Sequence, residues 1–197
     1  MDFDFEKESK RPVVMKILIK TFIWVAEIAA VIFLAYFIIY YALEKTEVIG
    51  NSMETTLYDG EPIIINKFSY RFSEPKRFDV IVFKQSGKEH SFYNIKRIIG
   101  LPGETIQLKD QNIYIDGLIV EDIVNTEPMK NYGLADEEIV LEENEYFVLG
   151  DNRNSSEDSR FASVGTIRKD EIIGKAFIRL SPFNFVNKIN QKQEKEE

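Results

Sequence analysis

An almost continuous apolar run from Thr21 to Leu43 constrains this chain more than any other feature of its sequence. As a helix, these 23 residues would extend roughly 34 Å, which is enough to cross the hydrocarbon core of a membrane. Trp24 lies near one end and the pair Tyr40-Tyr41 near the other, where amphipathic rings favour the membrane interfaces. The sequence therefore predicts a transmembrane anchor over 21–43.

A cleavable targeting segment is the alternative interpretation of this run. Its apolar part would be about 7–15 residues long and would end at a small-residue cleavage site. The run here is longer and ends in Tyr-Tyr-Ala-Leu-Glu-Lys, without an Ala-x-Ala exit. Glu27 is its one acidic residue, and close to an end of the span a carboxylate can reach the interface, protonate or meet a partner.

Basic residues precede the run, and Lys/Arg near a span set its orientation. We expect a cytoplasmic N-terminus and an extracytoplasmic bulk in the cell membrane. The expected parts are a cytoplasmic segment 1–20, the anchor 21–43, a domain 44–186 and a charged tail 187–197. The basic residues are Lys7, Lys10, Arg11, Lys16 and Lys20.

The composition excludes several classes of function. Of the net charge of −8, residues 1–44 carry −1, which leaves −7 on residues 45–197. An acidic domain is a poor binder of nucleic acid. The chain has no cysteine, which excludes disulfides, thiolate catalysis and cysteine-ligated zinc. The single histidine, His90, lies in a polar stretch and is interpreted as a solvated surface residue, so neither a Ser-His-Asp triad nor a typical zinc site is expected.

After the anchor the pattern is typical of strands. Short β-branched or aromatic runs are bounded by Gly, Asp, Pro or Asn, and Asp116-Gly117 suits a tight hairpin turn. We predict a mostly β domain with a barrel-like antiparallel sheet, and a small acidic excursion over 121–144. The predicted strands are 62–66, 79–83, 105–108, 112–115, 118–120, 146–149 and 172–178.

With His90 interpreted as a surface residue, paired carboxylates remain possible in principle, and a lysine can act as the base for a serine nucleophile. Burial lowers the pKa of a lysine toward neutrality, so a desolvated lysine can accept a proton. Lys96 lies in the apolar stretch Ile95-Lys96-Arg97-Ile98-Ile99, although an exposed strand lysine beside an exposed arginine remains an alternative. Ser52 lies in a Gly-Asn-Ser-Met turn in which Gly50 could present amide donors to an oxyanion, although a serine in a turn is usually structural.

Three segments of the chain resemble the motifs of type I signal peptidases, the Ser/Lys membrane proteases that remove signal peptides from exported proteins. The family's Ser-Met-x-Pro-Thr-Leu is matched by residues 52–57, and its Lys-Arg-x-x-Gly-x-Pro-Gly-Asp by residues 96–104. Its Gly-Asp-Asn-Arg-x-x-Ser-x-Asp-Ser-Arg is matched in full from Gly150 to Arg160. The motifs occur in family order behind an N-terminal anchor, and the single span and short length are similar to the compact Gram-positive forms.

The resemblance implies a role for each matched residue. Ser52 would be the nucleophile and Lys96 the general base, with Ser156 as a hydrogen-bonding partner that orients the lysine. Asp158 and Arg160 would form an ion pair that stabilises the loop. The backbone amides of Ser52 and Gly50 would serve the oxyanion. Many relatives carry a side-chain hydroxyl at the position of Gly50, so another donor would have to replace it.

The sequence departs from the family pattern at four positions. Thr55 stands where proline is usual and Phe78 where glycine is usual. Asn94 replaces a frequent tyrosine, and Glu104 replaces aspartate. None of these changes removes a catalytic group, but Asn94 alters the expected substrate pocket.

The implied function is cleavage of signal peptides from preproteins, with no cofactor or metal. Substrate would lie as an added strand against the segments around Ile49 and Asn94, beside the lipid bilayer and in reach of the protein translocation machinery. Two alternatives remain at this point. One is a catalytically silent anchored β domain that binds or regulates a secretion complex. The other is a self-cleaving repressor-type Ser/Lys protease, against which the anchor and the acidic charge argue.

Overall fold

The N-terminal part of the chain is one long helix. The computed structural model describes residues 11–84 and 93–189, so His90, the basic residues before 11 and the tail beyond 189 lie outside the described residues. Helix α1 (Arg11–Ala42) begins ten residues before the predicted anchor, and Val13–Ala42 is long and apolar enough to cross a membrane. Glu27 lies near the middle of this helix, and the limits 21–43 of the membrane span within it stay a prediction.

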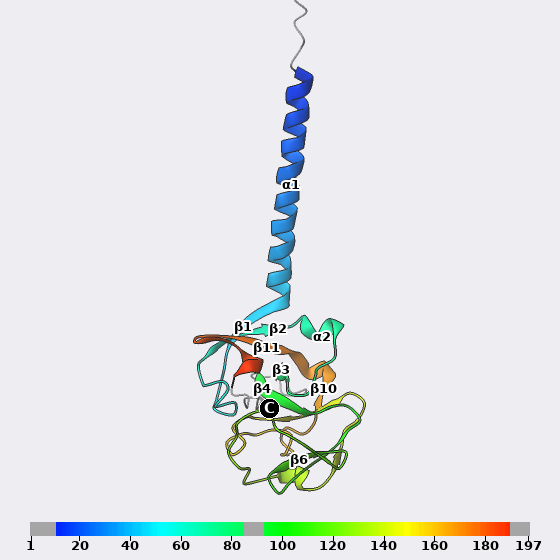
Figure 1. The fold of residues 1–197 in the computed structure, drawn as a ribbon, viewed down its shortest axis with the longest axis vertical. Coiled ribbons are helices and arrows are strands. Elements are labelled where there is room, and N and C mark those ends of the chain that lie inside the picture. The colour runs from blue at the N-terminus through cyan, green and yellow to red at the C-terminus, as the bar shows by residue number, and fades with distance from the viewer. Residues whose placement is uncertain (1–10, 85–92, 190–197) are drawn as a thin grey trace, which may run out of the picture. The chain divides into compact units, whose positions relative to one another are not determined.

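From Ala42 onward the chain forms a separate compact unit, built on an antiparallel sheet (Figure 1). Its strands follow the order β1-β2-β11-β3-β4-β9-β10, with β12 paired to β11. The prediction of a mostly β, antiparallel domain behind one apolar helix is confirmed. The strands are β1 (Leu43–Glu47), β2 (Pro62–Asn66), β3 (Val80–Phe83), β4 (Asn94–Gly100), β9 (Glu145–Leu149), β10 (Ile167–Arg168), β11 (Ile172–Leu180) and β12 (Phe183–Phe185).

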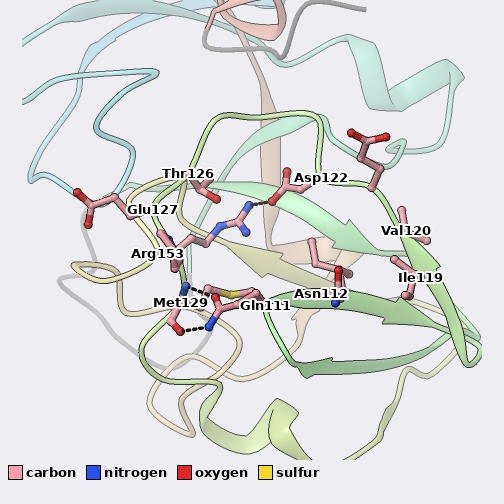
Figure 2. A pocket seen from close by; sticks show the side chains of 12 residues that line it. Gln111, Asn112, Ile119, Val120, Asp122, Thr126, Glu127, Met129 and Arg153 are labelled. Atoms are coloured by element: carbon pink, nitrogen blue, oxygen red, sulfur yellow. Dashed lines mark hydrogen bonds and ion pairs between the residues drawn. The ribbon is translucent and has the colours of Figure 1, made fainter. Parts of the chain in front are cut away.

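A smaller sheet has the order β7-β6-β5-β8. The hairpin turn between β6 and β7 has positive φ angles of 50° at Asp116 and 77° at Gly117, as the Asp-Gly pattern predicts. The predicted excursion 121–144 contributes β8 to this sheet, and a cavity of about 550 Å³ opens beside β6 and β7 (Figure 2). The strands are β5 (Thr105–Lys109), β6 (Asn112–Ile115), β7 (Leu118–Val120) and β8 (Ile139–Val140).

Short helical segments lie between or after the strands of this unit. They are α2 (Ser69–Phe72), and the 3₁₀ turns η1 (Gly133–Asp136), η2 (Lys169–Glu171) and η3 (Val186–Lys188).

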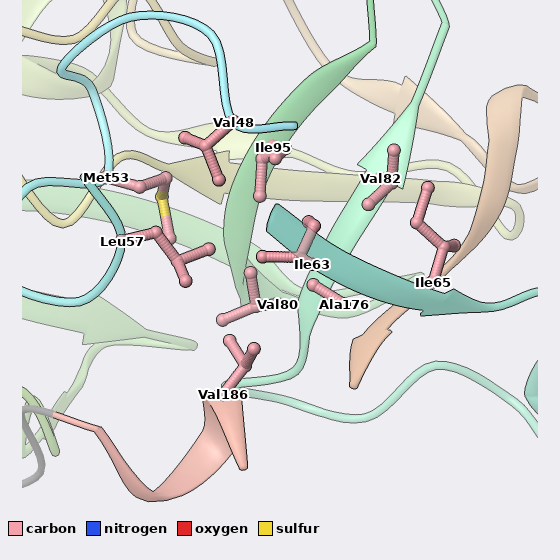
Figure 3. Close-up of a cluster of buried hydrophobic side chains, with 10 residues drawn as sticks. All are labelled: Val48, Met53, Leu57, Ile63, Ile65, Val80, Val82, Ile95, Ala176 and Val186. Carbon is pink, nitrogen blue, oxygen red and sulfur yellow. The ribbon is translucent and has the colours of Figure 1, made fainter. Parts of the chain in front are cut away.

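One hydrophobic cluster joins the two segments that carry Ser52 and Lys96. Met53 and Leu57 from the turn after the serine pack in the same cluster as Ile95 of β4 (Figure 3). Burying side chains of this size contributes roughly 1.5–3 kcal/mol each. The core therefore holds the serine turn against the lysine strand. The other members are Val48, Ile63, Ile65, Val80, Val82, Ala176 and Val186.

Two departures from the family pattern occupy the left-handed region of backbone space. Thr55 has φ 80° and Phe78 has φ 68°. A β-branched residue is rarely found there, and proline, whose ring holds φ near −65°, cannot adopt it. The turn after Ser52 therefore follows a path that the usual proline would not allow, whereas the usual glycine at 78 would adopt this backbone readily.

Candidate active site

Ser52 and Lys96 lie within hydrogen-bond distance of each other. Lys96 Nζ is 2.7 Å from Ser52 Oγ. Lys96 is on β4 opposite Ile81 of β3, and β4 is a central strand whose residues beyond Asn94 are buried. The alternative of an exposed lysine beside an exposed arginine is therefore wrong, because Lys96 is 5% exposed and Arg97 0%.

The surroundings of Lys96 favour its neutral form. Burial lowers the pKa of Lys96 from its ordinary value of 10.5 to about 8, because the charged ammonium loses its hydration. The carboxylates of Asp158, Glu157 and Asp151 act in the opposite direction and limit the shift. A substantial fraction of Lys96 is therefore neutral just above neutral pH, and its lone pair can take the proton of Ser52.

The loop Gly150–Arg160 holds the serine turn from the other side. Asn152 N donates to the Ser52 carbonyl at 3.1 Å, and its side chain Nδ2 donates to the Asn51 carbonyl at 3.1 Å. These bonds connect residues about a hundred positions apart in the chain. The loop is thus a structural partner of the nucleophile.

Ser156 lies in this loop but does not make the expected hydrogen bond to Lys96. Its Oγ is buried and has no hydrogen-bond partner among the described residues. It packs against Gly150, where an added Cβ would lie 2.2 Å from Ser156 Oγ and 2.5 Å from the Ser52 carbonyl oxygen. The prediction that Ser156 hydrogen-bonds to Lys96 is therefore wrong. Its role in orienting the lysine stays a prediction, supported by its position beside the Ser52 carbonyl.

Gly150→Ala is expected to remove most of the activity. The Cβ would overlap Ser156 and the Ser52 carbonyl at distances that real Cβ atoms do not show, so the loop or the nucleophile must shift. Displacements of about 1 Å can cost on the order of 100-fold in rate. Cleavage assays on Gly150→Ala should show this loss. In Gly165→Ala the added Cβ meets no atom within 4 Å, so its φ of 66° should cost stability but leave the activity of the folded enzyme intact. Equal activities of the two variants would contradict the argument.

The ion pair expected between Asp158 and Arg160 is present and buried. Arg160 Nε donates to Asp158 Oδ1 at 2.8 Å and Nη2 donates to Oδ2 at 2.8 Å. Asp158 Oδ2 also accepts from Gly150 N at 3.0 Å, and Arg160 Nη2 donates to the Arg153 carbonyl at 2.6 Å. The pair therefore connects both ends of the loop.

A second buried ion pair was missed by the sequence analysis. Arg97 Nε and Nη2 donate to the two oxygens of Asp151 at 2.8 and 2.6 Å, and both side chains are fully buried. Thr56 Oγ1 donates to the same carboxylate. Each partner belongs to one of the three motifs, directly beside or near Lys96, Gly150 and Ser52. No local pattern in the sequence connects these residues, because Thr56 and Asp151 are 95 positions apart and Arg97 and Asp151 are 54 apart.

The backbone donors predicted for the oxyanion differ in availability. In the part of the chain that the structure describes, the Ser52 N–H has no hydrogen-bond partner. The Gly50 N–H, by contrast, donates to Asp59 Oδ1 at 2.7 Å. Gly50 has φ 86°, so glycine is needed at this turn for its backbone. The prediction that the Gly50 amide is an oxyanion donor is therefore wrong, because this N–H already donates to Asp59.

The residues predicted to bind substrate flank the serine and the lysine. Ile49 is 64% exposed and lies two residues after the end of the short strand β1, and Asn94 begins β4 opposite Phe83. Strand β9 pairs with β4 only from Arg97 onward. On that side, Ile95 and Lys96 lie before the start of this pairing in the part of the chain that the structure describes.

Comparisons with known proteins identify the relatives of this chain. The family model described as signal peptidase, peptidase S26, matches residues 21–181. Signal peptidase I of Bacillus licheniformis is 35% identical over 174 residues, which cover 85% of this chain and 92% of that protein. Signal peptidase I T of Bacillus subtilis (strain 168) is 34% identical over 168 residues, covering 82% and 86%. Among solved structures, a signal peptidase I from Enterococcus faecalis V583 aligns at a TM-score of 0.43 with 31% identity, covering 52% of this chain and 97% of that chain.

The family matched over this length is one of membrane-anchored serine endopeptidases that cleave signal peptides. This chain belongs to it: it is a signal peptidase of the peptidase S26 family.

Proposed function

We propose that Ser52 is the nucleophile and Lys96 the general base with which this enzyme cleaves signal peptides. The observation that carries the proposal is the 2.7 Å separation of Lys96 Nζ and Ser52 Oγ in a buried setting. A lysine can serve as base only when it is uncharged, and the burial that lowers its pKa to about 8 supplies this condition.

In the acylation step, Lys96 takes the proton of Ser52 Oγ as the oxygen attacks the scissile carbonyl carbon. The charge that develops on the carbonyl oxygen is stabilised by the Ser52 N–H. The carbon–nitrogen bond then breaks, and the protonated lysine gives its proton to the departing amine. In the second step Lys96 takes a proton from water, the water oxygen attacks the acyl carbon, and the proton returns to Ser52 Oγ.

The preprotein would lie as an added strand between Ile49 and Asn94. The side of β4 at Ile95 and Lys96, where the pairing with β9 has not yet begun, supports this, because an extended peptide can form main-chain hydrogen bonds to such an edge. The scissile bond would then lie beside Lys96. Ser156, Asp158 and Arg160 would hold the loop in place, and Ser156 would also pack beside the reacting serine.

The remaining parts of the proposal concern location. The helix Val13–Ala42 would span the lipid bilayer with the N-terminus in the cytoplasm and the catalytic domain outside, next to the translocation machinery. The basic residues before the apolar run at Thr21, of which Lys16 and Lys20 lie on this helix, support this orientation. The anchor would keep the active site near the membrane, where the apolar part of a signal peptide also resides, and so raise its effective concentration. The domain limits 1–20, 21–43, 44–186 and 187–197 remain part of this proposal.

The pH profile of cleavage tests the assignment. The rate kcat/KM for a preprotein in detergent should rise about tenfold per pH unit below the pKa of about 8 and level off above it, because only the neutral lysine is active. Ser52→Ala, assayed at the plateau pH, gives the background and should show no cleavage. A rate that falls between pH 7 and 9, or cleavage by Ser52→Ala, would overturn the proposed roles.

A further inference from the structure

The cavity beside the small sheet is a candidate binding site outside the Ser52–Lys96 pair. It measures about 550 Å³, within the range of roughly 300–1,000 Å³ that is typical of ligand pockets. Four successive residues of the chain, from Ile119 to Asp122, line it. Since successive side chains of a strand point to opposite faces, the cavity follows the edge of β7 and its continuation.

A buried arginine forms part of the cavity wall (Figure 2). The side chain of Arg153 is 1% exposed, and its Nη2 lies 2.5 Å from Asp122 Oδ2. The guanidinium and the carboxylate therefore satisfy each other within the wall, and Arg153 also donates to the Gly150 carbonyl.

The edge of the sheet at this cavity is open and apolar. In the described part of the chain, β7 has one neighbour, β6, and is the end of its sheet. Leu118 is 73% and Ile119 61% exposed. An exposed strand edge presents a row of backbone groups that an extended peptide can pair with. The cavity therefore offers backbone pairing and apolar contact together.

Arg153 connects this cavity to the active site. Its Nε donates to the Gly150 carbonyl at 3.0 Å, and Gly150 lies against the Ser52 carbonyl. Arg153 is three positions after Gly150 in the chain, so their Cα atoms are at most about 11 Å apart. A few residues of extended polypeptide suffice to reach from the scissile bond to this wall.

We propose that this cavity binds the segment of the preprotein that follows the cleaved bond, as an extended strand beside β7. The inference rests on the proposed function, because it takes the occupant to be the same polypeptide that Ser52 cleaves. Carboxylates of Glu121, Asp122 and Glu127 line the cavity against the one guanidinium of Arg153. The site therefore accepts apolar or basic segments and disfavours acidic ones.

Two peptide substrates test this inference on the full chain in detergent. Both have the same residues up to the first position after the scissile bond; one ends there, and the other continues with eight apolar and basic residues. The wild type should cleave the long peptide with a KM about 5- to 10-fold lower, as expected for partial burial of a few apolar side chains. Ile119→Asp should remove this advantage and leave the short peptide unaffected. Val140→Asp on β8, at the opposite edge and 70% exposed, is the matched control and should behave as wild type.

A binding measurement makes the test independent of turnover. The eight-residue segment alone, carrying a fluorophore, should bind Ser52→Ala with an anisotropy change that is lost in Ser52→Ala/Ile119→Asp and weakened when acidic residues replace its basic ones. If Ile119→Asp does not fold, Ile119→Ser takes its place. Equal KM values for the two peptides, absence of binding, or equal effects at Ile119 and Val140 would overturn the inference. Cleavage by Ser52→Ala would instead overturn the proposed function.

Discussion

Lys96→Met is expected to abolish cleavage and to make the folded protein more stable. Without the amine, Ser52 has no base, and loss of one member of a nucleophile–base pair can cost up to about 10⁶-fold in kcat. The free energy of unfolding at pH 7 should rise by up to about 3 kcal/mol, because a pKa lowered from 10.5 to about 8 corresponds to that cost of keeping the ammonium buried. Methionine has a similar length and no charge to desolvate.

The pH dependence gives the sign of this effect. The unfolded chain keeps the Lys96 proton up to about pH 10.5, whereas the folded protein releases it near 8. Between these values the unfolded state binds more protons, so the folded state gains stability as the pH rises. Below pH 8 the full cost is present. The difference in stability between Lys96→Met and wild type should therefore be largest at pH 7 and shrink toward pH 10.

Urea unfolding of both full chains in detergent, followed by circular dichroism at several pH values, measures this difference. Preprotein cleavage is assayed on the same samples. Lys169→Met is the matched control, because Lys169 is a partly exposed lysine whose side chain is 42% accessible. A Lys96→Met protein that is inactive but less stable than wild type at pH 7 would contradict a buried lysine with a lowered pKa.

Asp151→Ala is expected to destabilise the domain by about 3–5 kcal/mol. The substitution would leave the fully buried guanidinium of Arg97 without its carboxylate, and breaking one side of a buried pair has this cost. Thr56 would lose its acceptor as well. Since Arg97 adjoins Lys96 and Thr56 follows the serine turn, the rate of cleavage should fall together with the stability.

The exposed pair of Arg168 and Asp170 provides the control. Its side chains are 58% and 62% exposed, so Asp170→Ala should change the free energy of unfolding by less than about 0.5 kcal/mol. Urea unfolding and preprotein cleavage of both variants give the comparison. An Asp151→Ala protein as stable as Asp170→Ala would show that the buried network does not hold the motifs together.

The strand pattern and the local motifs were readable from the sequence because both depend on neighbouring residues. The run 62–66 and the Asp-Gly hairpin form as predicted, since alternation and turn chemistry act over a few positions. The serine and lysine motifs were recognisable for the same reason. Their arrangement in space also agrees with what the resemblance implied for Ser52 and Lys96.

What the sequence did not reveal depends on residues far apart in the chain. The use of the Gly50 amide depends on Asp59, and the burial of Arg97 depends on Asp151, which lies 54 positions away. The isolated Ser156 hydroxyl reflects the close approach of Gly150 and the Ser52 carbonyl. The central position of Glu27 follows from a helix that starts earlier than the apolar run. None of these features has a periodic or local signal.

The shared packing of Met53 and Ile95 has a consequence for how heat inactivates the enzyme. Ser52 precedes Met53 and Lys96 follows Ile95, so both adjoin side chains that are buried in one hydrophobic cluster. We therefore expect heating to separate Ser52 from Lys96 only when this cluster unfolds. Activity should then be lost over the same few degrees as the folded structure. The cleavage activity that remains at a given temperature should therefore report the fraction of folded protein.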